Sequence, residues 1–167
     1  MPNITFAGKA LTLEGTPQIV GNIAPDFTLL DKNLNKKSLK DFKEKVIIIS
    51  VVPSLDTPVC DAQTRRFNEE AAKLPNVKIL TISADLPFAQ ARWCGAAGIT
   101  ANETLSDHLN TNFGLAYGLL VKELRLLARA VLVLNAERRI VYQEVVPEMT
   151  NPVNFDAALA CAKKALG

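Results

Sequence analysis

The stretch KVIIISVVPSLDTPVCDAQTRRF (residues 45–67) decides the fold, because it joins a continuous apolar run to the start of a helix. Residues 45–52 are mostly β-branched and do not alternate with polar residues, which is typical of a central strand covered on both faces. The run ends at Pro53. From Pro58 to about Lys73, apolar or small residues recur among charged ones, which predicts an amphipathic helix. The stretch therefore predicts a buried strand, a short loop and a helix.

Other segments continue this mixture of strands and helices. The further predicted elements are, in chain order, a β-hairpin of ITFAG and ALTLEG around Gly8-Lys9, strands over 27–30 and 77–83, a helix over 86–95 stopped by Gly95, a short helix within 106–117, a hairpin of ARAVLVLN and RIVYQEVV, and a last helix with Asn154 as N-cap. The order β-α-β-α and then β-β-α predicts an α/β protein with a thioredoxin-like fold. Its central mixed sheet is flanked by helices, and the first hairpin is an N-terminal extension.

The composition narrows the class of protein. A chain of 167 residues that is 49% hydrophobic predicts a single domain over 1–167. Nineteen basic and 17 acidic residues give a net charge of +2, and the basic residues are scattered, which argues against nucleic-acid binding. No apolar stretch approaches the roughly 18 residues of a membrane span, and the N-terminal residues do not resemble a secretory signal, so we expect no membrane partner and a cytoplasmic location.

The three cysteines are the candidate reactive residues of the sequence. An odd number in a chain of this kind does not suggest a secreted disulfide framework, so redox or catalytic use is favoured. Thr57 is a natural N-cap and Pro58 suits the first helical position, which puts Cys60 in the first turn at the positive end of the helix dipole. That position favours a thiolate by only about 0.3 to 1 kcal/mol. Asp61 opposes it, although Arg65 can pair with Asp61. Activation of Cys60 therefore requires a further cation.

Each of these residues also has a purely structural interpretation. Cys60 could be a small buried hydrophobe between strand and helix, and capping alone would explain Thr57. Cys161 lies among alanines in the last helix, where a free core cysteine is the favoured interpretation. Cys94, in contrast, is a second cysteine in a setting comparable to that of Cys60. These patterns favour chemistry at Cys60 and Cys94 and a structural role for Cys161.

Two other functions are compatible with the residues. A cysteine hydrolase would use Cys60 with His108, the only histidine, as its base. A thioredoxin-like disulfide exchanger would ordinarily carry a Cys-x-x-Cys pair, but Thr57 stands where the first of those cysteines would be. One histidine and dispersed cysteines also argue against a metal site.

Five stretches of the sequence carry a family resemblance. PSLDTPVCDAQTRRFN, TISADLPFAQARWCGAAGI, ARAVLVLN and the N-terminal TFAGKALTLEG with GNIAPDFTL resemble the thiol peroxidase branch of the peroxiredoxins, the atypical two-cysteine type. The P-x-x-x-T-x-x-C core is general to peroxiredoxins, whereas SADLPFAQARWCG is specific to this branch. The resemblance runs essentially from end to end.

The resemblance implies a site and a reaction. The site would hold Cys60 as the peroxidatic cysteine, Cys94 as the resolving cysteine, Arg129 as the cation beside the thiolate, and Pro53 and Thr57 as the rest of the pocket. KELRLLARAV departs from the family pattern, so Arg125 competes with Arg129.

The implied enzyme reduces organic hydroperoxides and hydrogen peroxide to alcohol or water, with no cofactor or metal. Cys60 passes through a sulfenic acid to an intramolecular Cys60–Cys94 disulfide. Thioredoxin reduces this disulfide, and the protein is a homodimer.

The implied disulfide requires the two helices that carry Cys60 and Cys94 to come close together. Its two Cα atoms must come within about 4.4 to 6.8 Å, yet each cysteine is predicted to lie on a different helix. We therefore expect the first turn around Cys60 and the end of the Cys94 segment to fray on oxidation, with Gly95 and Gly98 lending backbone freedom.

Overall fold

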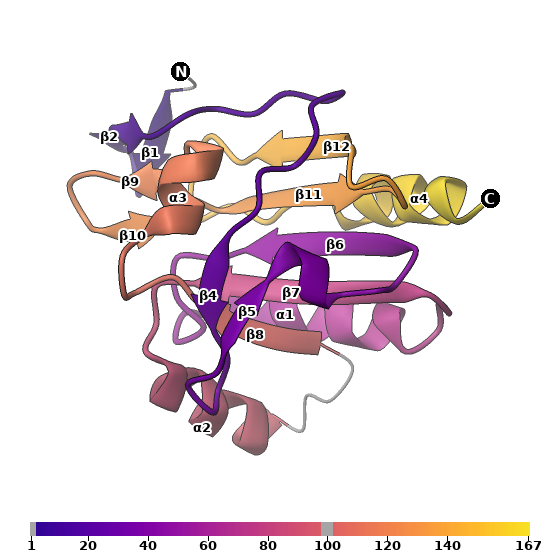
Figure 1. Ribbon diagram of the computed structural model, residues 1–167. Coiled ribbons are helices and arrows are strands. Elements are labelled where there is room, and N and C mark those ends of the chain that lie inside the picture. Colours follow the sequence, from indigo (N-terminus) through magenta and orange to yellow (C-terminus); the bar gives the residue numbers. More distant parts are fainter. Residues whose placement is uncertain (1–2, 98–101) are drawn as a thin grey trace.

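A seven-stranded mixed sheet forms the centre of the computed structural model, which describes residues 3–97 and 102–167 (Figure 1). The strand order is β12-β11-β6-β7-β8-β4-β5. The strands are β4 (Thr28–Leu30), β5 (Lys36–Ser38), β6 (Val46–Val51), β7 (Val77–Ser83), β8 (Asn102–Ser106), β11 (Ala130–Leu134) and β12 (Ile140–Val145). Strands β6, β7 and β8 are parallel to one another, and the other neighbouring pairs are antiparallel. This arrangement confirms the predicted α/β, thioredoxin-like plan.

Strand β6 is covered on both faces, as its apolar run predicts. All six of its residues are buried. Ile47 and Ile49 point to one hydrophobic cluster, whereas Val46 and Ile48 point to the other. Since side chains of a strand alternate between faces, two cores favour apolar residues on both sides of the strand. The one polar residue, Ser50, accepts a hydrogen bond from Gln63.

Helices cover the two faces of the sheet. Helix α1 (Pro58–Ala71) packs against β7 and β8, and α4 (Phe155–Leu166) packs against β6, β11 and β12. Both lie behind the sheet in Figure 1, whereas α3 (Asn112–Tyr117) lies in front and packs against β4. Asn154 is the N-cap of α4, as predicted, and its side chain accepts a hydrogen bond from the backbone N of Ala157 at 3.0 Å.

The N-terminal hairpin is present as predicted. Strand β1 (Ile4–Phe6) pairs with β2 (Lys9–Leu11), and the turn lies at Ala7-Gly8, one residue earlier than expected. A small three-stranded sheet adjoins it, formed by β3 (Leu13–Glu14), β9 (Leu120–Val121) and β10 (Leu126–Leu127).

Two predicted helix boundaries are wrong. Helix α2 (Pro87–Ala97) continues through Gly95, because a glycine inside a helix costs only about 1 kcal/mol and does not by itself end it. The helix predicted within 106–117 is limited to α3, since Ser106 still belongs to β8 and the loop up to Thr111 precedes the helix. The segment ALTLEG, predicted as one strand, divides between β2 and β3. Strand β8, the 3-10 turn η1 (Leu39–Asp41) and strands β5, β9 and β10 were not predicted. Gly98 lies outside the described residues.

Candidate active site

Cys60 lies at the start of α1, directly after the loop that leaves β6. Thr57 is the N-cap of α1 and Pro58 is its first residue, as predicted. Thr57 Oγ1 accepts a hydrogen bond from the backbone N of Cys60 at 3.4 Å. The Thr57 side chain accepts from one of the backbone N–H groups that the first turn leaves without a partner, and the proline has no N–H group to satisfy. Cys60 therefore occupies a position where the helix favours negative charge.

The Cys60 sulfur contacts the guanidinium of Arg129. Cys60 is 0% exposed and Arg129 only 2% exposed, and Arg129 Nη2 donates a hydrogen bond to Cys60 Sγ at 3.2 Å. Burying a charge costs much free energy unless the charge is paired. The contact supplies the cation that the helix end alone lacks.

Two further hydrogen bonds hold Arg129 in place. Its Nε donates to the carbonyl oxygen of Met149 at 2.8 Å, and its Nη1 donates to Gln63 Oε1 at 3.0 Å. Gln63 is oriented in turn because its Nε2 donates to Ser50 Oγ at 2.7 Å. Within residues 3–97 and 102–167, no ion pair joins Arg129 to a carboxylate. Cys60 Sγ is thus the contacting group that can become an anion.

Arg125, the competing cation, lies in a different place. It is exposed in the turn between β9 and β10, with a φ of 53°, and its backbone N donates to the carbonyl of Val121 at 2.8 Å. The structure therefore brings Arg129 to Cys60, and Arg125 stays on the surface.

A cavity of about 320 Å³ lies at the start of α1, beside residues that pack against the buried Cys60. Leu55 packs against the buried Cys60, and Trp93 of α2 lies against the same cluster. The cavity is lined by Leu55, Asp56, Thr57, Pro58, Asp61 and Trp93. Pro53 is buried at the end of β6. A small substrate in this cavity would contact Thr57 and approach Cys60.

Asp61 is neutralised on the outer side of α1. Arg65 Nε lies 2.7 Å from Asp61 Oδ1, the pairing that the spacing of these residues predicts. The Arg65 guanidinium also lies over the Trp93 ring, 5.7 Å from its centroid. These contacts reduce the repulsion that Asp61 exerts on a negative charge at Cys60.

Cys94 has different surroundings. It is half-buried on α2, and its Sγ lies 3.7 Å from Thr104 Oγ1 on β8. Burial raises the pKa of the Cys94 thiol above its ordinary range, an effect that the Thr104 hydroxyl partly offsets. Both Cys60 and Cys94 are free thiols. Trp93 packs at Cys60 while its neighbour Cys94 faces Thr104, and successive helical residues point about 100° apart. A bond between Cys60 and Cys94 therefore requires α2 to turn or unwind.

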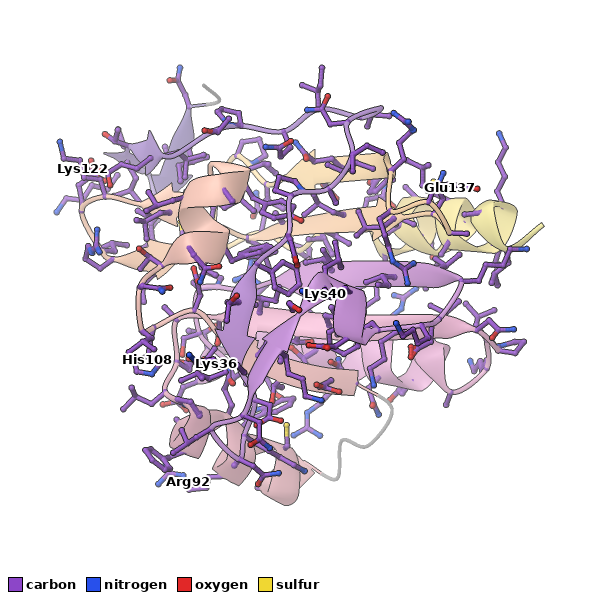
Figure 2. The ribbon with its side chains drawn as sticks, in the orientation of Figure 1. Lys36, Lys40, Arg92, His108, Lys122 and Glu137 are labelled. Atoms are coloured by element: carbon purple, nitrogen blue, oxygen red, sulfur yellow. The ribbon has the colours of Figure 1, made fainter. Side chains whose placement is uncertain are left out.

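His108 and Cys161 lie on other elements. His108 is on the loop after β8, at the periphery of the molecule in Figure 2, and its backbone N donates to Ser106 Oγ at 3.4 Å. Cys161 is half-buried on α4, and its Sγ donates to the carbonyl of Val141 at 3.6 Å. Among the described residues, no group of three His, Cys, Asp or Glu side chains is placed to hold a metal ion. In the same part of the chain, no helix has the length and apolar character needed to cross a membrane.

The chain is similar to known proteins along most of its length. The sequence model of the family described as Redoxin matches residues 19–159. The chain belongs to the redoxin family. A thiol peroxidase of Bacillus subtilis (strain 168) is 60% identical over 163 residues, which cover 98% of each chain. This redoxin is thus similar to the thiol peroxidases, which confirms the resemblance seen in its motifs.

Solved structures give the same result for the fold. A peroxiredoxin-like protein from Aquifex aeolicus superposes on this redoxin with a TM-score of 0.92 and 35% identity, over 99% of this chain and 98% of that chain. A thiol peroxidase from Chromobacterium violaceum gives a TM-score of 0.89 over 99% of this chain and 97% of that chain. At 20% identity, that match supports the fold alone.

Sequence reasoning missed two groups in the redoxin's site. Gln63 lies three residues after Cys60 on α1, and residues at this spacing share a helix face, so the spacing could have indicated it. The carbonyl of Met149, which accepts from Arg129, lies in the loop between β12 and α4. A backbone acceptor of this kind leaves no signal in the sequence.

Proposed function

We propose that the protein is a thiol-dependent peroxidase that reduces organic hydroperoxides and hydrogen peroxide, with Cys60 as the attacking sulfur. Thiol-dependent peroxide reduction is the activity that the redoxin family and the thiol peroxidase relatives support. The observation that carries the assignment to Cys60 is the 3.2 Å contact between Arg129 Nη2 and Cys60 Sγ. A buried arginine without a carboxylate partner among the described residues stabilises a thiolate in contact with it.

The peroxide step follows from these groups. The Cys60 thiolate attacks one peroxide oxygen, so that an S–O bond forms as the O–O bond breaks. The departing oxygen takes a proton and leaves as water or an alcohol, and Cys60 becomes a sulfenic acid. Negative charge moves from sulfur to the departing oxygen during this step. Arg129 has N–H groups beside the sulfur that can stabilise this charge as it moves.

Thr57 and Pro53 complete the proposed pocket. Thr57 lines the cavity beside Cys60 and carries a hydroxyl that can hydrogen-bond a peroxide oxygen. Pro53 is buried just after β6, and the resemblance assigns it to the pocket wall. The cavity is also lined by Leu55 and Trp93, which suit the apolar part of an organic hydroperoxide.

Cys94 is the proposed resolving cysteine. Its thiolate attacks the sulfur of the Cys60 sulfenic acid, an S–S bond forms, and the hydroxyl group leaves as water. Because Cys94 faces Thr104 before this step, α2 has to rearrange and Trp93 has to leave the cluster around Cys60. Gly95 lies within α2, and its lack of a side chain lowers the cost of unwinding there. The expected fraying on oxidation belongs to this step.

The reductant, the assembly and the location complete the proposal. A dithiol protein such as thioredoxin reduces the Cys60–Cys94 disulfide through a mixed disulfide, and two electrons return to the enzyme. We further propose that the chain forms a single domain, that it assembles as a homodimer and that it acts in the cytoplasm. The domain organisation and the location extend the expectations drawn from composition, and the reductant and the dimer extend those drawn from the resemblance.

The competing functions have less support. In a cysteine hydrolase, His108 would have to act on Cys60, but the hydrogen bond recorded to the Cys60 sulfur within the described residues comes from Arg129. In a disulfide exchanger, a second cysteine would stand three residues from Cys60, but Thr57 and Gln63 occupy those two positions. Neither residue can form a disulfide.

One equivalent of an organic hydroperoxide, such as tert-butyl hydroperoxide, tests the proposal. The three free thiols should fall to one, the intact mass should fall by that of two hydrogen atoms, and peptide mapping should recover Cys60 bonded to Cys94. The proposal is wrong if the hydroperoxide is not consumed, or if the bond that forms includes Cys161.

A further inference from the structure

Asp85, in the bend between β7 and α2, binds the loop that precedes Cys60. Its Oδ1 accepts a hydrogen bond from Ser54 Oγ at 2.7 Å, and its Oδ2 accepts one from the backbone N of Leu55 at 2.8 Å. Both donors lie in the loop between β6 and α1. The bend at Asp85 thus fixes a side chain and a backbone group of this loop.

Hydrogen bonds of Thr57 connect this loop to Cys60. Thr57 Oγ1 donates to the carbonyl oxygen of Ser54 at 3.2 Å and accepts from the backbone N of Cys60 at 3.4 Å. The Thr57 hydroxyl has one hydrogen to donate, so its orientation depends on where the Ser54 carbonyl lies. Asp85 holds Ser54 and therefore sets the direction of the Thr57 hydroxyl at the cavity.

The same carboxylate also connects to the helix that carries Cys94. Ser83 Oγ donates to Asp85 Oδ2 at 2.8 Å and accepts from Gln90 Nε2 at 3.0 Å. The buried Gln90 also donates to the carbonyl of Leu105 at 2.9 Å. Gln90 lies four residues before Cys94 on α2, so both side chains lie on the same face of the helix, against β8. The Ser83–Gln90 hydrogen bond therefore holds the part of α2 that has to move for Cys94 to reach Cys60.

A carboxylate suits this arrangement better than a neutral amide. Asp85 accepts three hydrogen bonds with its side chain and donates none, whereas an asparagine would present two N–H groups in the same space. Within the described residues, Asp85 forms no ion pair, so its charge is stabilised by neutral donors. Hydrogen bonds to an ionised acceptor are about twice as strong as neutral ones.

We propose that Asp85 is a positioning residue that couples the two steps of the cycle, an inference that rests on the proposed peroxidase function. Its bonds to Ser54 and Leu55 hold Thr57 in place for the reaction of Cys60 with peroxide. Its bond to Ser83 supports the contact with Gln90, which keeps α2 folded and delays disulfide formation. The same residue speeds the first step and slows the second.

Separate measurement of the two steps tests this coupling. The first rate is oxidation of Cys60 by tert-butyl hydroperoxide in a Cys94→Ser background, followed by rapid quenching and mass spectrometry. The second is disulfide formation with Cys94 present, followed by the fluorescence of Trp93, the only tryptophan. In Asp85→Asn we expect the first rate to fall by about ten-fold or more, because the catalytic groups lose their alignment. The second rate should rise, because the bond that keeps α2 folded is weakened.

Two comparison variants separate coupling from general damage. Ser83→Ala removes the link to Gln90 but leaves the contacts of Asp85 with Ser54 and Leu55, so only disulfide formation should become faster. Asp41→Asn is the matched control, because Asp41 also accepts from a backbone N and a serine hydroxyl, both of Ser38, and lies in η1. It should leave both rates unchanged.

The outcomes are distinct. The coupling is refuted unless Asp85→Asn slows the first step and speeds the second, and it is also refuted if Ser83→Ala does not speed disulfide formation. Should Asp85→Asn fail to fold, Ser54→Ala replaces it, and an unchanged first rate in that variant refutes the coupling. Failure of the proposed function would show differently, since Cys60 would then not be oxidised even with Asp85 intact.

Discussion

Cys60 and Cys94 lie in the same molecule with contrasting surroundings. Cys60 is fully buried and contacts a buried guanidinium, whereas Cys94 is half-buried and its polar neighbour is the neutral hydroxyl of Thr104. A cation in contact with a thiol favours its thiolate, whereas burial by itself favours the protonated form. The contrast teaches that burial alone does not decide reactivity. The polar group that is buried with the sulfur decides it.

Removal of Cys94 should have the largest effect. In Cys94→Ser, turnover with thioredoxin and thioredoxin reductase should fall to background, because no disulfide can form within the chain. Oxidation of Cys60 by one equivalent of hydroperoxide should continue and stop at the sulfenic acid, which a dimedone-type reagent traps. Full turnover in this variant would show that Cys94 is not the resolving cysteine.

Removal of the charge at Arg129 should have the next largest effect. In Arg129→Gln, the rate of Cys60 oxidation should fall by about 10²- to 10³-fold, since a buried donor to the moving charge is lost. Stopped-flow mixing with hydroperoxide measures this rate. Arg125→Gln is the matched control and should react at the wild-type rate, because Arg125 is exposed in the turn between β9 and β10. Equal losses in the two variants would contradict the assignment of the cation.

The pH should act on the step that uses Cys94. Burial raises the pKa of its thiol, so the thiolate that attacks the sulfenic acid is a minor species near neutral pH. As the pH increases from 7 to 9, the rate of disulfide formation should increase by up to about ten-fold per unit, in proportion to the thiolate fraction. The fluorescence of Trp93 after mixing reports this rate. A rate that does not change with pH would show that deprotonation of Cys94 does not limit the step.

The smallest effect is expected at the third cysteine. Cys161 is half-buried on α4, where its Sγ donates to the carbonyl of Val141, and burial raises the pKa of its thiol. Cys161→Ser should change the rates of peroxide reduction and disulfide formation by less than about two-fold, because serine keeps a donor for the carbonyl. Loss of activity in this variant would give Cys161 a role in the cycle.

The start of α1 could be predicted because its signals are local. Thr57 and Pro58 specify the first turn by capping and by a fixed backbone angle, and both act within a few residues of Cys60. The apolar run of β6 is equally local. The residues alone singled out Cys94 beside Cys60, and the resemblance gave Cys94 its role and added Arg129, with Arg125 as the competing cation. The choice between them depends on which arginine the pairing of β9 with β10 leaves in the turn.

Strand β8 and the contacts of Asp85 could not be predicted in this way. The sequence NETLS of β8 is short and mainly polar, and its burial is made possible by tertiary partners, such as the Thr81 hydroxyl that donates to Asn102 Oδ1 at 2.7 Å. Asp85 acts on Ser54 and Leu55, about thirty residues earlier in the chain. Such pairings exist only when parallel strands bring their ends together, and no periodicity along the chain records them.

The most direct test of the account is the identity of the first sulfur to be oxidised. Reduced wild-type protein would be mixed with less than one equivalent of hydroperoxide together with a sulfenic acid trap, quenched at early times and mapped by mass spectrometry. The account predicts that the trapped oxygen adduct lies on Cys60 at the earliest times and that the Cys60–Cys94 disulfide follows. First oxidation at Cys94 or Cys161 would contradict the claim that contact with Arg129 selects the sulfur that attacks the peroxide.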